Sequence, residues 1–319
     1  MKKPFLIILS VLISSLILLG IVGLMKAGLV SAADDPNKTF ALKPAPVKGG
    51  DKEKIIYKFE ATATAKFPSM GSHPATPMYS RMERETEQKL VEIDSDTMEI
   101  VKIERNYKSS KVLLSKTSTE GKTDIFNGKV LMIDNMNDIA LKDASASKDP
   151  KKADGGITDE IKQTMSIDEN NFRLILPPSS EVKIGDKWDV DGRAAERIFN
   201  FANPRVRPLH HGCREIGINC KLTQGKMSCT LKEVKKPKGV SDECAIIDIS
   251  VNFKGNDSGL ELSAAMSGTA TFNLKKGKFI KVECKGPLTM KGQQPCTGTY
   301  GSIGPVECVG EVKVAVEFK

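Results

Sequence analysis

Apolar and polar residues alternate with a period of two over several long stretches of the chain. The clearest run begins at Ile55, where apolar residues occupy every second position up to Ala65 and Lys, Glu and Thr fill most positions between them. The alternation returns over 226–231, 245–253, 270–274, 280–284 and 312–318. Successive side chains of a strand point to opposite faces of its sheet, so the pattern predicts strands with one buried face.

Turn signals separate these runs, among them Asp257-Ser258-Gly259 and Lys276-Gly277. Asn127-Gly128 lies between two apolar runs and predicts a type I′ hairpin that joins 123–126 to 129–134. Thr158 is a candidate cap for a short helix over 159–165. No run is followed by the helical crossover that a parallel sheet requires. We therefore predict a mainly β fold, an antiparallel meander forming a curved sheet or half-barrel, with one or two short helices.

Composition divides the chain into five segments. Residues 1–32 read as a signal peptide or signal anchor, and the Pro- and Gly-containing stretch 33–54 as a flexible leader. An N-terminal antiparallel β half is expected over 55–142. A linker with a short helix and an irregular segment follows over 143–224, and a cysteine-rich C-terminal β half covers 225–319.

The N-terminus predicts export. Lys2 and Lys3 precede an uncharged run from Phe5 to Met25, and Val30-Ser31-Ala32 fits a signal-peptidase site. The run is also long enough to cross a bilayer, so retention as an inner-membrane anchor is the alternative to cleavage. In both cases the positive-inside rule places the rest of the chain outside the cytoplasm, either periplasmic or secreted, or tethered to the membrane.

Charge and composition limit the classes of ligand and partner that we expect. The formal net charge is +8, but basic and acidic residues are interspersed, as in residues 81–85, and no dense basic stripe forms. Nucleic acid is therefore not an expected partner. Aromatic residues make up only 5% of the chain, which disfavours a sugar site. The G-x-S-x-G, P-loop, H-E-x-x-H and Cys-x-x-Cys motifs are absent, and we expect no cofactor.

All seven cysteines lie beyond residue 212, which in an exported protein predicts disulfides confined to the C-terminal part. One cysteine of the seven is left unpaired. The candidate bridges are Cys213–Cys220, Cys229–Cys244 and Cys296–Cys308.

The strongest candidate for metal chemistry is the segment that contains His210, His211, Cys213 and Cys220. Two imidazoles beside two thiols could bind zinc or copper. The spacing fits no standard zinc finger, and a solvated histidine pair beside a disulfide explains it better. This segment supports the alternative function, a metal-dependent or hydrolytic periplasmic enzyme.

The stretch from Leu176-Pro177-Pro178 to Val182-Lys183-Ile184-Gly185-Asp186-Lys187-Trp188 resembles a P-x-V-x-x-G-D-x-W segment of uncharacterised secreted bacterial β-rich proteins. Their closing hairpin is similar to residues 268–272 and 277–280, so the resemblance covers roughly 55–319. It implies a fold and no chemistry. The layout is also reminiscent of lipoprotein carriers such as LolA, which bind acyl chains on a concave apolar face. The Gly-Asp turn is expected to direct Trp188 into the core.

These observations favour a non-enzymatic exported envelope protein. Its β scaffold would bind a protein partner or an apolar, lipid-like ligand. The expectation rests on the export signal, the strand-dominated alternation and the lack of any recognised catalytic motif.

Overall fold

The computed structural model describes residues 38–66, 75–93, 100–113, 122–123, 126–134, 138–142, 151–152, 172–179, 181–190, 205–206, 216–217, 221–257, 260–293 and 305–319. The chain separates into two units, Met1–Thr39 and Phe40–Lys319. The second unit contains nearly all of the described residues.

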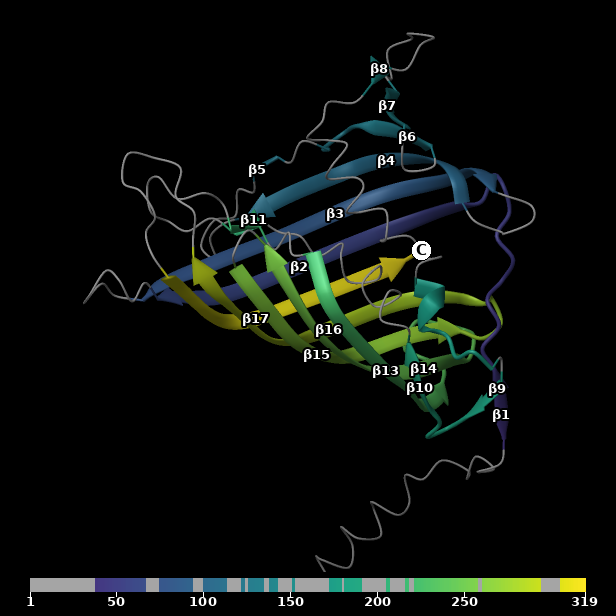
Figure 1. The fold of residues 1–319 in the computed structure, drawn as a ribbon. Helices are drawn as coiled ribbons and strands as arrows, with labels where there is room; N and C mark the ends of the chain where they lie inside the picture. Colours follow the sequence, from purple (N-terminus) through teal and green to yellow (C-terminus); the bar gives the residue numbers. More distant parts are fainter. Residues whose placement is uncertain are drawn as a thin grey trace, which may run out of the picture. The chain divides into compact units, whose positions relative to one another are not determined.

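One antiparallel sheet of thirteen strands dominates this unit (Figure 1). Along its path the strands are β10 (Lys187–Val190), β13 (Lys221–Lys235), β14 (Cys244–Asp257), β15 (Leu260–Asn273), β16 (Lys278–Gln293), β17 (Pro305–Phe318), β2 (Lys52–Lys66), β3 (Thr76–Ile93), β4 (Ile100–Leu113), β6 (Val130–Asp134), β7 (Asp138–Lys142) and β8 (Lys151–Lys152). The remaining strand, β5 (Lys122–Thr123), also pairs with β4.

The sheet is curved and, over the described residues, does not close, since β10 and β8 form its two edges. The predicted fold class is thus confirmed. Two smaller pairs accompany it, β1 (Thr39–Ala41) with β9 (Glu181–Lys183) and β11 (Arg205–Val206) with β12 (Ile216–Gly217). A single 3-10 turn, η3 (Arg173–Ile175), is the helical element of the described part.

The two β halves are joined by the pairing of β17 with β2. The ladder runs from Glu307 opposite Lys66 to Phe318 opposite Ile55. Beyond it, Lys54 and Lys319 exchange two further main-chain hydrogen bonds of 2.9 and 2.8 Å. Strands from opposite ends of the sheet's sequence therefore lie side by side, and the apolar faces of both halves become one surface.

Three glycines allow the sheet to bend sharply. Gly268 in β15, Gly286 in β16 and Gly310 in β17 all occupy inner-face positions, in the same alternation as the buried residues of their strands. At each one, a Cβ atom would overlap with the main chain of the neighbouring strand. The β15–β16 ladder also skips the pairs between Ala264–Leu288 and Ser267–Lys285. Glycine is needed where one backbone approaches another this closely.

The Asn127-Gly128 turn is present, but the hairpin predicted around it is wrong. Gly128 has φ +72°, as a tight turn requires. Its flanking strands do not pair with each other, because Thr123 lies opposite Lys111 and Val130 opposite Asn106, both in β4. The turn lies between β5 and β6, which both pair with β4. A hydrogen bond from the Ser110 amide of β4 to the Asn127 side chain (3.0 Å) holds the turn against that strand.

Several predicted features lie outside the described residues. They are the apolar run Phe5–Met25 with its cleavage site, the first five residues of the leader (33–37), and the short helix over 159–165. The rest of the leader is described and includes β1 and the buried residues Phe40 and Leu42. Among the residues that are described, no helix is long and apolar enough to cross a membrane.

The bend at the glycines can be tested with Gly286→Ala and Gly310→Ala. Each added methyl group meets the backbone of the adjacent strand, so we expect the free energy of unfolding to fall by about 2–4 kcal/mol. Urea unfolding followed by circular dichroism measures the loss. Gly49→Ala is the matched control, because its nearest contact would be an ordinary 3.7 Å to the Val91 carbonyl. Stabilities unchanged in the two strand variants would contradict the close approach.

Candidate functional site

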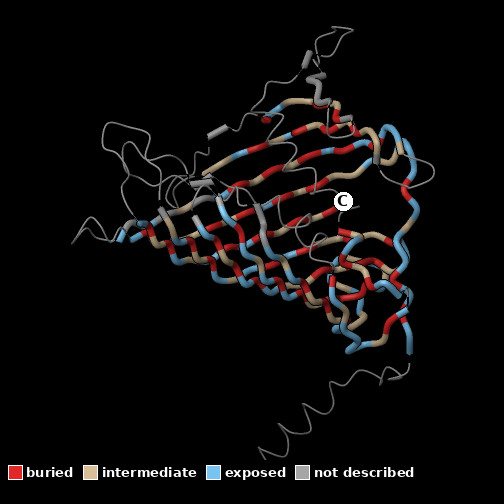
Figure 2. Tube along the Cα trace, viewed as in Figure 1, coloured by how far each residue is buried: buried red, intermediate tan, exposed pale blue. Residues whose placement is uncertain are grey.

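The inner positions of the sheet form a continuous cluster of buried apolar residues. Buried residues alternate with more exposed ones along each long strand, as the repeated red and paler segments of Figure 2 show. The inner positions of β13–β17, β2 and the start of β3 belong to one cluster, which includes Met227, Cys229, Leu231, Ala245, Ile247, Ile249, Val251, Leu262, Ala264, Met266, Ala270, Phe272, Val282, Cys284, Leu288, Met290, Val312, Val314, Val316, Ile55, Tyr57, Phe59, Ala61 and Met82.

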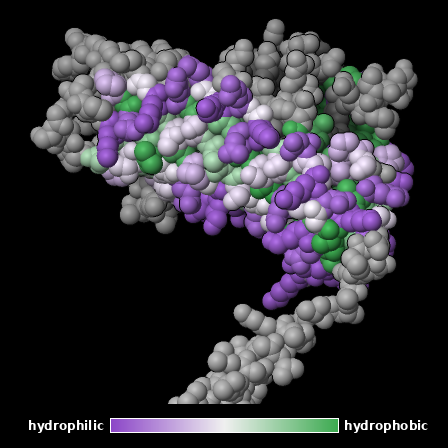
Figure 3. Space-filling model, turned by 60° about the horizontal axis from the view of Figure 1, so that its bottom comes forward, coloured by the Kyte–Doolittle hydropathy of each residue, from purple (hydrophilic) through white to green (hydrophobic). Residues whose placement is uncertain are grey.

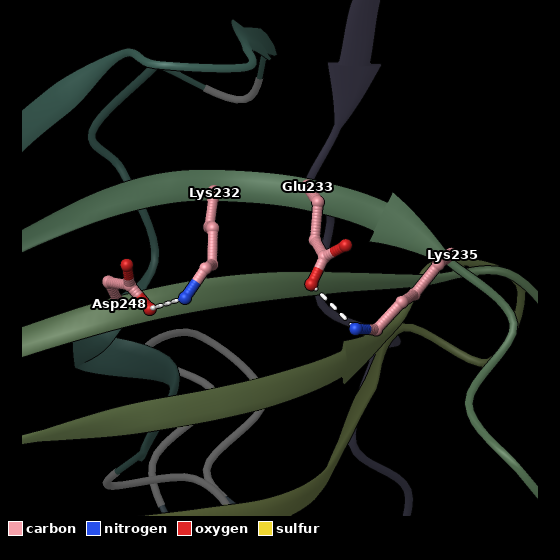
Figure 4. Close-up of polar contacts among 4 residues, drawn as sticks. All are labelled: Lys232, Glu233, Lys235 and Asp248. Atoms are coloured by element: carbon pink, nitrogen blue, oxygen red, sulfur yellow. Dashed lines mark hydrogen bonds and ion pairs between the residues drawn. The ribbon is translucent and has the colours of Figure 1, made fainter. Parts of the chain in front are cut away.

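The outer face is charged. Cross-strand ion pairs include Lys54–Glu85 (2.6 Å) between β2 and β3 and Lys291–Glu307 (2.7 Å) between β16 and β17. Figure 4 shows a further cross-strand pair, Lys232–Asp248 between β13 and β14, and the Glu233–Lys235 pair within β13. Exposed pairs of this kind add little stability, but they keep the surface solvated. In the view of Figure 3, hydrophilic side chains prevail over much of the described surface.

The segment Phe172–Pro177 packs against one end of the inner face. Phe172 and Ile175 are fully buried, and the Phe172 ring meets Phe318 of β17 edge to face, with centroids 5.4 Å apart. The indole N–H of Trp188 donates a 2.7 Å hydrogen bond to the Ile175 carbonyl. The only tryptophan of the chain is thus half-buried and fixes this segment to β10.

The Gly-Asp turn before Trp188 has the structural role expected from the sequence. Gly185 adopts φ +93° and its amide donates to the Leu231 carbonyl of β13 (2.7 Å). The Asp186 carboxylate accepts a hydrogen bond from the Lys183 amide (2.8 Å). These contacts place β10 along β13, with Trp188 opposite Cys229, so that the indole packs against the core.

A strip of buried polar residues crosses the inner face on β3 and β4. Its members are Arg84, Thr86, Gln88, Arg105 and Ser110, each at most 7% exposed. The β3–β4 register places Arg84 opposite Ser110 and Gln88 opposite Arg105. The strip lies between the large apolar cluster and a smaller one formed by Val47, Leu90, Ile103, Tyr107, Phe126, Leu131 and Ile133. The inner face is therefore polar at this strip and apolar on both sides of it.

The two arginines of this strip are held by contacts that include neutral partners. The Nε and Nη2 atoms of Arg105 donate to the Gln88 side-chain oxygen at 3.1 and 2.7 Å. The Nε of Arg84 donates to the Ser110 hydroxyl (3.1 Å), and its guanidinium lies 4.9 Å from the centre of the Phe126 ring. Both arginines also take part in other interactions. Burying a guanidinium is costly unless its donors are satisfied, and these contacts satisfy part of them.

Tyr107 stands within the same strip. It is opposite Thr86 and two residues beyond Arg105 on the same strand face, and its ring stacks on Phe126 with centroids 4.8 Å apart. The side chain is 1% exposed, yet its hydroxyl has no hydrogen-bond partner. A buried hydroxyl without a partner is uncommon and calls for an explanation.

The cysteine predictions are partly corrected. Cys229 and Cys244 are buried free thiols and do not form the predicted bridge. The reason is the register, in which Cys229 lies opposite Ile249 whereas Cys244 lies opposite Lys235, at the far end of β13. Cys308 is buried in β17, and its predicted partner Cys296 lies outside the described residues. The Cys213–Cys220 bridge falls outside them as well and stays a prediction.

The predicted metal ligands are not among the residues that the structure describes. His210, His211, Cys213 and Cys220 all lie outside the residues that the structure describes. Within the described ranges, no group of three or more His, Cys, Asp and Glu side chains is arranged to hold a metal ion. The alternative of a metal-dependent enzyme therefore stays a prediction.

Sequence reasoning missed the polar strip, although the signal was present. Residues 81–85 were considered only as interspersed basic and acidic residues that form no basic stripe. Continued through this segment, the period of two puts Arg84 on one face with Met82 and Thr86, opposite to the exposed Arg81. In the same way, Arg105 falls between Ile103 and Tyr107. Strand periodicity alone could have shown that both arginines face inward.

Comparisons with known proteins give distant structural neighbours. No protein-family model matches the chain, and no curated protein matches it. Among solved structures, one of lipovitellin titled for lipid–protein interactions aligns with a TM-score of 0.36 and 10% identity over 85% of this chain. The chain covers 26% of that lipovitellin chain. An outer membrane channel from Pseudomonas putida F1 aligns with a TM-score of 0.21 and 8% identity, over 90% of this chain and 100% of the channel.

The low reactivity expected of the buried Cys229 and Cys284 thiols can be tested. Burial raises the pKa of the Cys229 and Cys284 thiols to about 12, chiefly because the thiolate would lose its hydration. We expect neither to react with a disulfide reagent at pH 8 in the native protein, and both to react in guanidinium chloride. Because the folded pKa lies above the unfolded one, their contribution to stability is intact below about pH 9 and lost between about pH 9 and 12. Peptide mapping of the labelled cysteines decides the matter, and rapid native labelling of either thiol would contradict it.

Proposed function

We propose that this protein is a non-enzymatic envelope protein whose curved sheet binds a lipid-like amphiphile on its inner face. The observation that carries the proposal is the continuous cluster of buried apolar side chains at the inner positions of β13–β17, β2 and β3. An apolar interior of this extent, opposite a charged outer face, suits a long hydrocarbon chain. Each methylene group that leaves water contributes about 0.8 kcal/mol.

The kinds of side chain on the inner face also favour such a ligand. Four of its residues are buried methionines, Met82, Met227, Met266 and Met290. Methionine is unbranched and polarizable, so it adapts to flexible apolar ligands. Alanines such as Ala61, Ala264 and Ala270 occupy inner positions where larger side chains would take up more room.

The polar strip on β3 and β4 favours an amphiphilic ligand over a purely apolar one. A pure hydrocarbon has no acceptor for the two buried guanidinium groups. A chain with a polar end matches an apolar face that ends in a polar strip. Envelope location is part of the same proposal and is supported by the charged start and apolar run of the N-terminal sequence.

The proposal is tested with palmitate and a matched pair of substitutions in β15. Ala264 faces inward and is 4% exposed, while its neighbour Ala265 is on the outer face. We expect the wild-type protein to bind palmitate, and Ala264→Phe to weaken binding about tenfold because the phenyl ring occupies the apolar surface. Ala265→Phe should bind like the wild type. Isothermal calorimetry on the full chain gives the affinities, and emission of Trp188 reports whether the fold is retained.

Overpacking alone would lower stability by about 1–3 kcal/mol without changing ligand affinity. If Ala264→Phe is less stable but binds palmitate as before, the inner face at this position is ordinary core. Should the wild type bind no palmitate, and should organic extraction of the natively purified protein release no lipid, the proposed function is wrong.

A further inference from the structure

We infer that the polar strip on β3 and β4 is the site for an anionic headgroup, and that the ligand is a long-chain carboxylate. This inference rests on the proposed function, since it assigns one end of the proposed ligand to named residues. The residues that would contact the carboxylate are Arg84, Arg105 and Tyr107.

The first argument is the charge of the strip. Arg84 and Arg105 are 4% and 2% exposed, and both belong to the face that carries the apolar clusters. Guanidinium groups stay protonated at any physiological pH and present N–H donors in a planar fork that fits a carboxylate. A buried guanidinium needs acceptors for its donors, and a ligand carboxylate is an acceptor that would add to the contacts both arginines already have.

The second argument is the Tyr107 hydroxyl. It is a buried donor without a partner, and the register places it between the positions of the two arginines. Leaving such a group unsatisfied costs about as much as a lost hydrogen bond. A ligand oxygen at this position would accept the phenolic O–H, which gives the hydroxyl a reason to be there.

The third argument is how the neighbouring side chains support the strip. Gln88 holds the Arg105 guanidinium through two hydrogen bonds to one oxygen, and Ser110 with Phe126 holds that of Arg84. Phe126 also stacks on Tyr107, so one ring contacts both an arginine and the tyrosine. Side chains positioned in this way lose little freedom when a ligand binds.

A carboxylate fits better than a phosphate monoester on grounds of charge. At neutral pH the carboxylate carries one negative charge, whereas a phosphate monoester carries close to two. Since the strip is buried, the smaller charge is the less expensive one to take out of water. The larger apolar cluster beside the strip then accommodates the hydrocarbon chain.

The experiment compares palmitate with hexadecanol, which has the same chain length and no charge. We expect the wild-type protein to bind palmitate about tenfold more tightly than hexadecanol. Arg105→Gln and Tyr107→Phe should each weaken palmitate binding about tenfold and leave hexadecanol binding unchanged. Arg81→Gln is the matched control, because Arg81 lies on the outer face of the same strand as Arg84 and pairs with Glu83. It should alter neither affinity.

Tyr107→Phe separates a binding role from a structural one. Removal of a hydroxyl that has no protein partner should leave the melting temperature unchanged or higher, while palmitate affinity falls. This variant also decides the question if Arg105→Gln fails to fold. Equal affinities of the wild type for both ligands, or a preference that survives Tyr107→Phe, would overturn the headgroup site while hexadecanol binding still supports the proposed function. Binding of neither ligand would contradict both.

Discussion

The pairing of β17 with β2 is the constraint on which the rest of the structure depends. Without it, the chain would form two separate antiparallel sheets, each with an open edge beside an apolar face. With it, the apolar positions of both halves merge into one surface that a sheet of half the width could not provide. The cost is kinetic, because strands that are far apart in sequence must meet before the sheet is complete.

The two faces of the sheet contribute differently to the stability of the fold. Burial of apolar side chains on the inner face provides the main driving force for folding, while the ion pairs outside contribute little beyond solubility. The polar strip on β3 and β4 opposes this arrangement, since each buried guanidinium lowers stability unless its donors are satisfied. Proteins keep such costly groups mainly where they recognise something, and this contrast links the architecture to the proposed ligand.

Much of the fold followed from the sequence, because strand periodicity is a local property. The alternation from Ile55 to Ala65 and from Val312 to Phe318 predicted both strands correctly. That these two strands pair with each other was not predictable, since no local signal identifies a partner at the other end of the chain. Asn127-Gly128 gave the right turn and the wrong partners for the same reason. The site depended on reading Arg84 and Arg105 as inward positions, and their charge suggested surface instead.

The buried thiols have a consequence for how the protein reaches its native state. Cys229 and Cys284 are shielded once the sheet has formed, but before that they are ordinary thiols with an ordinary readiness to oxidise. In the proposed envelope location, folding and oxidation would therefore compete. A disulfide formed too early would tie together strands that the native register keeps apart. Correct assembly requires the inner face to close before oxidants reach those sulfur atoms.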